Sequence, residues 1–435
     1  MGCGDSKGLT AKETPIKNKT SEQNLAKKEE SKVGEKNSTK NNNIISTENN
    51  IKKEESRKVH ENKEYRDKIN LIYYANYPAY YPIFGDNFVK QNKDNIDLLV
   101  NGKKNELADK CLLIKGENII TMVIKNKLTD LSCMFKNCQY LKDFSELKYL
   151  DVSQSNKFSE MFSGCVQLTD VNFLQNWNVS NSNSFLFMFC YCKSLKDIKG
   201  LENWDVSNSK GFYGMFYGCE SLKDIKPLHN WNVSNATEFI GMFSECKNLT
   251  DISGLQNWNV SKCTEFNSMF SGCSNITSFN ALKNWNVSKG KNLSSMFNGC
   301  SSLLDSKGFE NWDVSNANDL ASMFNSCSTL KEIESLINWN VSNCNNFSLM
   351  FKECSSLLNL KPLQNWNFSN GKQFGMMFYG CRNLLDIHTI ENWNVPKDGN
   401  YEAIFGQCDR TAVTKAIQKW NIPKEQIELI EKSTY

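Results

Sequence analysis

The chain has 435 residues, of which 40% are hydrophobic, and its 51 basic and 48 acidic side chains leave a net charge of only +3. A surface built for nucleic acid would show a clustered basic excess, so this balance argues against nucleic acid as a partner. The sequence contains no apolar run of about 18 residues and no apolar stretch near Met1. These features exclude a membrane-spanning helix and a secretory signal, and they predict a chain that stays in the cytosol.

The first segment, residues 1–64, is rich in Lys, Glu, Asn, Ser and Thr and contains no aromatic residue. Such a composition buries too little apolar surface to offset the entropy lost on ordering, so we expect a disordered tether. Its first six residues fit the N-myristoylation pattern, with Gly2 exposed after removal of Met1 and Ser6 at the sixth position. One myristoyl chain binds a membrane only marginally and two chains hold stably, so we expect lipid on both Gly2 and Cys3. A chance match on an unmodified chain is the alternative.

Aromatic residues then become frequent between residues 65 and 127. The run Ile96–Val100 followed by Asn101-Gly102 predicts a strand that enters a tight hairpin, and Ile119–Ile124 predicts a further strand. An array of stacked repeats needs an end cap, because an uncovered end exposes its core to water. We therefore expect residues 65–127 to form a small β-rich N-terminal capping module.

From residue 128 to about 410 the sequence repeats with a period of 27 residues, without insertion or deletion. Met-Phe pairs and eleven Cys, from Cys138 to Cys408, keep this step. Tryptophan keeps it through ten copies: Trp177, Trp204, Trp231, Trp258, Trp285, Trp312, Trp339, Trp366, Trp393 and Trp420. A fixed period of this kind indicates a solenoid, in which repeats stack and bury a shared interior.

The apolar spacing within one unit predicts a short strand over the Leu-x-x-Ile element, a tight bend after Trp, and a short helical turn between Phe212 and Cys219. The Asn before nearly every Trp, such as Asn203 and Asn230, is expected to form a ladder whose amides satisfy backbone groups of adjoining turns. The Ser that follows, such as Ser180, is suited to capping the bend.

The repeat resembles the BspA-like leucine-rich-repeat surface proteins, and more closely the variant repeats of mycoplasma lipoproteins and of many protist proteins. The resemblance rests on the Met-Phe, Gly-Cys, Leu-x-x-Ile and Asn-Trp-Asn-Val-Ser-Asn elements of Met215–Asn235, and on a leader between Ile83 and Asp130. It implies an α/β leucine-rich-repeat-type solenoid of about eleven 27-residue repeats that recognises other proteins and has no catalytic residues. The period is a few residues longer than in the commoner units of that family, which leaves the strand position and the curvature open.

Seventeen cysteines in one chain could indicate disulfides or metal sites. Eleven of them share one repeat position between core residues, which favours a small buried filler. Stacked side chains also point in parallel, which disfavours bridging, and a single file of thiols does not converge on a metal. None of the three His lies near a plausible nucleophile, so we expect no enzyme activity, no metal site and no cofactor.

The last residues, 411–435, are expected to close the array with a C-terminal helix. Pro423 suits the first turn of that helix, and Ile427 and Ile430 are expected to face inward.

These features together predict a non-catalytic protein–protein interaction scaffold, lipid-anchored to the cytoplasmic face of the plasma membrane, with a protein partner and no small-molecule substrate. The expected partner-binding row follows the Leu-x-x-Ile element: Lys196, Asp197, Lys223, Asp224, Asp251, Lys331 and Glu332. That row could equally be a solvated face. The alternatives are an exported cell-surface adhesin, whose repeated Asn-x-Ser sequons would carry sugar, and a structural array that self-associates.

Overall fold

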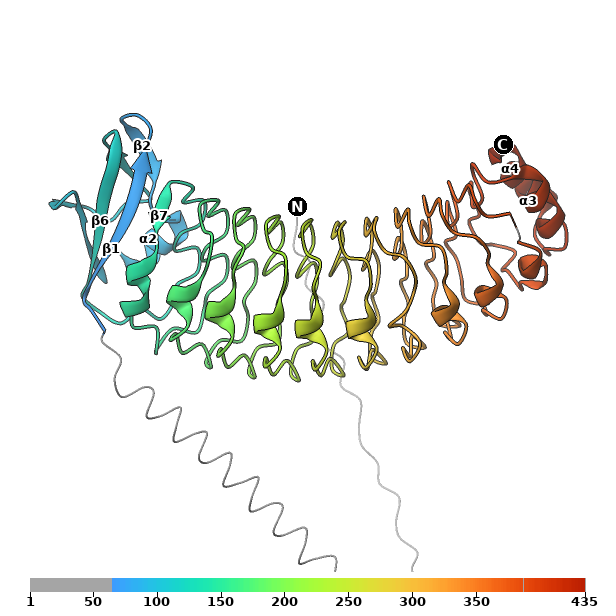
Figure 1. Ribbon diagram of the computed structural model, residues 1–435, viewed down its shortest axis with the longest axis horizontal. Coiled ribbons are helices and arrows are strands. Elements are labelled where there is room, and N and C mark those ends of the chain that lie inside the picture. The colour runs from blue at the N-terminus through green and yellow to red at the C-terminus, as the bar shows by residue number, and fades with distance from the viewer. Residues whose placement is uncertain (1–64, 386, 435) are drawn as a thin grey trace, which may run out of the picture. The chain divides into compact units, whose positions relative to one another are not determined.

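The computed structural model describes residues 65–385 and 387–434, and Tyr65–Tyr435 form one compact unit (Figure 1). The expected tether over residues 1–64 lies outside the described residues, as do the two predicted lipidation sites, Gly2 and Cys3.

Two antiparallel sheets stand at the start of this unit. The larger has the order β4-β3-β6-β1-β7, with β1 at Lys68–Ala75, β3 at Ile96–Val100, β4 at Lys103–Asn105, β6 at Gly116–Ile124 and β7 at Leu141–Asp143. The smaller pairs β2 (Ala79–Pro82) with β5 (Lys110–Leu113), and α2 (Asp86–Asn92) turns Phe88 and Val89 into the core. The predicted hairpin lies between β3 and β4, where Asn101 and Gly102 have φ angles of 49° and 78°. Both angles are those of the type I′ turn that Asn-Gly favours.

The edge strand β7 belongs to the repeat region, since it supplies the Leu-Lys-Asp of the first unit and pairs with β1. The buried residues of the sheets and of the repeats accordingly form one continuous hydrophobic core. The repeat interior therefore does not end at the first unit but is extended directly by the β-rich segment.

Each 27-residue unit forms one coil, counted here from the buried aromatic or leucine residue at positions 131, 158, 185 and so on to 401. Successive coils lie side by side in register, as the parallel bridges Gly211↔Glu238 and Glu238↔Glu265 show. Backbone hydrogen bonds join them further: the amide of Phe216 donates to the carbonyl of Met242 over 2.9 Å. The chain is thus a repeat protein with many short bridges, little regular strand and few helices (Figure 1).

The predicted helical turn between Phe212 and Cys219 is wrong. The amide of Met215 donates to Phe212 and that of Cys219 to Phe216, which makes a series of tight turns. Gly214 and Gly218 have φ angles of 57° and 70°, and residues with left-handed φ cannot continue a right-handed helix. Tight turns that close every three or four residues place apolar side chains at the same sequence intervals as a helix does, so the apolar spacing fits both structures equally well.

The helical residues lie in the predicted strand region instead. In five coils the acidic residue two positions after Leu, such as Asp197, forms an isolated bridge and is followed by a 3-10 helix; among the described residues only the first unit has a strand there, β7. The 3-10 helices are η1 (Ser145–Tyr149), η2 (Asn172–Leu174), η3 (Lys199–Leu201), η4 (Lys226–Leu228), η5 (Ser253–Leu255), η6 (Asn280–Leu282), η7 (Glu334–Leu336), η8 (Lys361–Leu363) and η9 (His388–Asn392).

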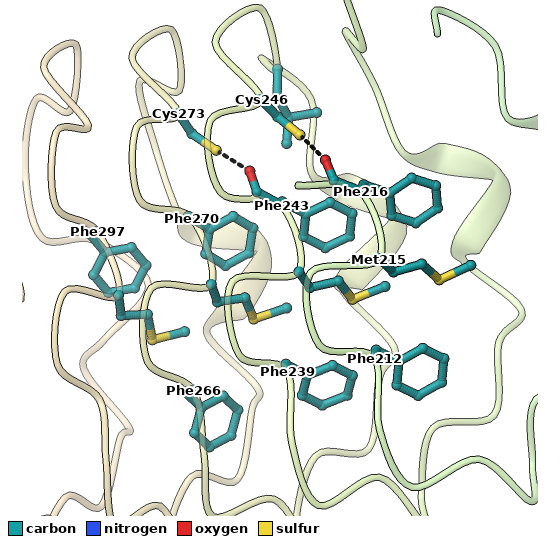
Figure 2. Packing of buried hydrophobic residues seen from close by; sticks show 14 of the residues in the cluster. Phe212, Met215, Phe216, Phe239, Phe243, Cys246, Phe266, Phe270, Cys273 and Phe297 are labelled. Carbon is teal, nitrogen blue, oxygen red and sulfur yellow. Dashed lines mark hydrogen bonds between the residues drawn. The ribbon is translucent and has the colours of Figure 1, made fainter. Parts of the chain in front are cut away.

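The interior consists of columns of one residue type. Phe216 and Phe243 stack with ring centroids 5.7 Å apart and planes within 1°, and Figure 2 shows this column beside a second column of Phe and one of Met. Trp231 and Trp258 stack in the same manner at 6.3 Å. Each buried aromatic side chain removes on the order of 150–250 Å² from water, so these columns supply much of the stability of the array.

The asparagine ladder exists, but at a different position from the predicted one. Asn203 and Asn230 are exposed, whereas Asn208 and Asn235, after each Val-Ser, donate to the carbonyls of Ser180 and Ser207 in the preceding coil, each over 2.8 Å. The capping roles are also reversed. The side chain of the residue after Trp accepts from the Ser amide, as Asn232 does from Ser234, because an Asx side chain forms such a turn more strongly than a Ser hydroxyl does.

Two helices close the unit, where one was expected. Asp409 caps α3 (Arg410–Ile417) by accepting from the amide of Ala412, and α4 (Lys424–Ser433) follows Pro423. Ile430 is buried and Ile427 is partly buried against the core, which agrees with the predicted orientation. In the part of the chain that the structure describes, no helix combines the length and apolar character needed to cross a bilayer.

Candidate functional site: an aromatic groove on the turn face

The tight turns of successive coils line up to form one side of the array, here called the turn face: the positions equivalent to residues 213, 214, 217 and 218 in every coil. A groove of about 640 Å³ crosses this face over five coils, from Glu160 to Ser271. It is lined by Glu160, Ser163, Phe187, Cys190, Tyr191, Tyr213, Tyr217, Ile240, Gly241, Ser244, Glu245, Asn267, Ser268 and Ser271.

Two of the lining aromatics occupy left-handed backbone positions. Phe187 and Tyr191 have φ angles of 52° and 57°, and the next coil has Gly214 and Gly218 at the same two positions. A bulky residue in this region costs on the order of 1 kcal/mol or more that glycine does not. No other coil in the sequence carries aromatic residues at both positions, although Leu349 and Glu353 also place long side chains there with positive φ.

The glycines of the next coil create the space that these rings occupy. A Cβ atom on Gly214 would clash with the Phe187 ring, and one on Gly218 would lie 2.7 Å from Cδ1 of Tyr191. The two aromatics therefore lean over the neighbouring coil, and there they meet its tyrosines. Phe187 and Tyr213 have centroids 4.6 Å apart, and Tyr191 and Tyr217 meet edge to face at 5.2 Å.

Hydrogen bonding to Tyr191, together with burial, raises the pKa of Tyr217 to about 12. The phenol therefore stays neutral at physiological pH. Tyr191 and Tyr213 remain 47% and 38% exposed. The four rings accordingly offer a neutral aromatic surface that solvent and a ligand can reach.

The charges in the groove are carboxylates. Glu160 pairs with Lys136 on the preceding coil, and Glu245 lies 3.6 Å from Lys247. Of the described residues that line the groove, none is a lysine or an arginine. Asn267 adds a side-chain oxygen that is buried and has no hydrogen-bond partner in the protein. The groove therefore presents acceptors and negative charge to a ligand.

Cys190 is the thiol of the groove, and it is poorly suited to act as a nucleophile. Burial raises its pKa to about 11, so it remains a thiol at neutral pH, and the thiolate is the reactive form. Within residues 65–385 and 387–434 no cluster of three His, Cys, Asp or Glu has the arrangement of a metal site. The arrangement of the groove fits binding by contact and charge.

The repeated Cys and Trp residues serve the interior. The Sγ of Cys246 donates to the carbonyl of Phe216 over 3.1 Å, and the Nε1 of Trp258 donates to that of Leu228 over 3.0 Å (Figure 2 for the thiols). The same two bonds recur from coil to coil. The sixteen described cysteines are all buried and free.

The predicted partner-binding row lies elsewhere, beside the 3-10 helices. Lys196, Asp197, Lys223, Asp224 and Asp251 come together on three successive coils, and Lys331 and Glu332 follow three coils further along. The three lysines are exposed.

The aspartates of this row already have local roles. Asp197 and Asp251 accept from the amides of Lys199 and Ser253, which starts the 3-10 helix of each coil. Asp251 also contacts Lys226 at 2.9 Å, and its hydrogen bond from Ser253 and this ion pair lower its pKa to about 2. Part of the mixed charge in this row is therefore used to order the coil itself.

Sequence reasoning missed the groove. The repeat pattern did not predict a role for Phe187, Tyr191, Tyr213 or Tyr217. A usable signal existed, because these are aromatic residues at positions where most other coils have Gly, Ser or Asn. Departures from the repeat at outward positions of neighbouring units would have identified the site.

A family model described as "Mycoplasma protein of unknown function, DUF285" matches three overlapping stretches, residues 129–252, 210–333 and 301–420, which together cover well over half of the chain. The overlaps reflect the coil repeat, since one model length spans several coils. None of the curated proteins and none of the solved structures compared with the chain matches it.

Proposed function

The chain belongs to the mycoplasma-type repeat family DUF285, and from this premise we propose that it is a non-catalytic scaffold that binds a protein partner on its turn face. We assign the stacked coils to the leucine-rich-repeat-type solenoids and the chain to the BspA-like group within them. The in-register coils with their shared interior support that assignment.

The single observation that carries the binding function is the groove. Interior positions hold nearly the same residue from coil to coil, whereas the turn face varies and gathers four aromatic rings over two coils. Exposed aromatic residues in a concave site are typical of protein-recognition hot spots. A groove of about 640 Å³ holds a few side chains of a partner.

Selection of peptides from a displayed random library on the full chain tests this function. The groove variant is Phe187→Gly with Tyr191→Gly, which places at both positions the residue that the next coil has and so preserves the backbone. The control variant is Leu349→Gly with Glu353→Gly, at the same two left-handed positions of another coil. We expect peptides whose binding is lost in the groove variant and retained in the control. If every selected peptide binds all three proteins equally, the groove is not the recognition site.

The proposal includes a lipid anchor on Gly2 and Cys3 that holds the scaffold to the cytoplasmic face of the plasma membrane. The Met-Gly-Cys start and the lysine-rich segment after it support this anchor. Intact-mass spectrometry of the protein from its own cells tests it, with loss of Met1 and addition of myristoyl as the expected result. An unlipidated chain that carries sugar on its Asn-x-Ser sequons would instead favour the exported adhesin.

A further inference from the structure

The rings of the groove have no cation over them, whereas three tyrosines elsewhere in the described residues do. Arg66 lies over Tyr149 at 3.5 Å, Lys142 over Tyr74 at 5.2 Å and Lys352 over Tyr379 at 5.8 Å, measured to the ring centroids. No cation–π contact among the described residues involves Phe187, Tyr191, Tyr213 or Tyr217.

The pair of Lys352 and Tyr379 shows which group the groove lacks, because these two residues occupy equivalent positions of the repeat six coils further along the chain. Lys352 and Tyr379 correspond in the repeat to Cys190 and Tyr217. Over Tyr379 the preceding coil supplies the ammonium group of Lys352. Beside Tyr217 the preceding coil supplies the buried, neutral thiol of Cys190, so a cation on this ring would have to come from outside the chain.

Two carboxylates flank the rings. Glu160 stands one coil before the aromatic coils and Glu245 one coil after them, so they are three coil steps apart. Adjacent coils joined by backbone hydrogen bonds are about 5 Å apart, which places the two glutamates roughly 15 Å apart along the groove. An extended peptide spans this distance in about four residues, and its residues i and i+4 point to the same side.

We propose that the groove binds an extended segment of a protein partner that carries arginine or lysine side chains, one lying on the aromatic rings and others meeting Glu160 and Glu245. This inference rests on the proposed function, and it adds the chemistry of the ligand. Arginine suits the site best, because its planar guanidinium stacks on tyrosine and forms two hydrogen bonds to a carboxylate.

The acidic lining decides between a basic peptide and the other ligands that aromatic grooves accept. A neutral oligosaccharide also stacks on tyrosine and its hydroxyls donate hydrogen bonds to carboxylates, but it has no positive charge to pair with them. An acidic segment is repelled by the carboxylates, so the charge of the lining favours the basic segment. Neither existing ion pair removes this preference, since Glu160 and Glu245 each have one lysine neighbour and retain further acceptor capacity.

Fluorescence anisotropy on the full chain tests the inference with a labelled heptapeptide that has arginines at its second, fourth and sixth positions in a Gly-Ser background, all three on one side of an extended chain. The comparison ligands are the same peptide with glutamate in place of arginine, and cellohexaose as a competitor. The expected result is binding of the arginine peptide alone. The Phe187→Gly, Tyr191→Gly variant should weaken it about tenfold through the loss of two ring contacts, and Glu245→Gln about threefold.

The Leu349→Gly, Glu353→Gly control should bind the arginine peptide as the native chain does. Equal binding by the native chain and the groove variant would overturn the inference, as would no binding at all or groove-dependent binding of the glutamate peptide or the sugar. Library peptides that need the groove but contain no basic residue would also overturn it, while leaving the scaffold function intact.

Discussion

Raising the pH above 9 should unfold this protein over a narrow interval, because eleven thiols stand in one buried column. Burial raises the pKa of each from the ordinary 9.0, and it raises those of Cys138 and Cys408, at the ends of the column, to about 12. The column consists of Cys138, Cys165, Cys192, Cys219, Cys246, Cys273, Cys300, Cys327, Cys354, Cys381 and Cys408.

The size of the effect follows from proton linkage. A thiol whose pKa is higher in the folded state than in the unfolded state leaves the free energy of unfolding unchanged below its unfolded-state pKa. As the pH rises from there to the folded-state pKa, each thiol lowers the free energy of unfolding by about 1 kcal/mol per pH unit. Eleven of them remove on the order of 10 kcal/mol per pH unit above pH 9, which is comparable to the total stability of a typical domain, about 5–15 kcal/mol.

The assay is urea unfolding followed by far-UV circular dichroism between pH 7 and 10.5 under a reductant. The variant replaces three neighbours in the column, Cys246→Ala, Cys273→Ala and Cys300→Ala. It should be less stable than the native chain at pH 7, because it loses three thiol hydrogen bonds and some volume. Its stability should nevertheless fall less steeply above pH 9, by about 3 kcal/mol per pH unit. Lysines and tyrosines titrate equally in both proteins, so identical slopes would refute the role of the thiols.

Three further perturbations test other parts of the structure. Trp258→Phe should lower the free energy of unfolding by about 2 kcal/mol in urea titrations, because it loses the bond from Nε1 to Leu228 and leaves a small cavity. Gly218→Ala should be more destabilising than Gly299→Ala by about 1 kcal/mol in the same assay. Both glycines have positive φ, so the backbone strain is common to the two variants. The methyl group added at Gly218 would clash with Tyr191, whereas the one added at Gly299 would lie 3.5 Å from the nearest atom. Asp251→Asn should cost less than about 1 kcal/mol at pH 7, and acid titration should show this difference disappearing between pH 4 and 2, since a carboxyl whose pKa is lowered to about 2 loses its contribution as it is protonated.

The interior could be predicted from the sequence because burial acts on every coil alike. A side chain that enters the shared core meets the same neighbours one coil later, so Trp, Met-Phe and Cys recur every 27 residues and their period is visible without a structure. The hairpin at Asn101-Gly102 was predictable for a local reason, since few residue pairs tolerate positive φ at both positions.

The path of the backbone between core positions was less accessible. Apolar residues at Phe212, Met215 and Cys219 fit a helix and a chain of tight turns equally well, and only the φ angles at Gly214 and Gly218 separate the two. In other coils the same two positions hold Glu, Ser, Leu or Met as well as glycine, and none of these four signals a left-handed conformation. Without that conformation the outward direction of Phe187 and Tyr191 was unknown, and so the groove was too.

The left-handed turn positions also explain why long side chains on the turn face are arranged in pairs of coils. A long side chain at the second of these positions lies over the equivalent residue of the next coil, which therefore must be small. In three successive pairs that next residue is glycine: Asn137 with Gly164, Tyr191 with Gly218, and Glu245 with Gly272. At this second position a ring or carboxylate can thus stand only where the following coil provides space for it. Along this row long side chains accordingly recur in steps of two coils, or 54 residues, from Asn137 to Glu245, although the core repeats every 27. The aromatic pair Phe187 and Tyr191 depends on two glycines at once, which makes the coil after it as much a part of the groove as the coil that carries the rings.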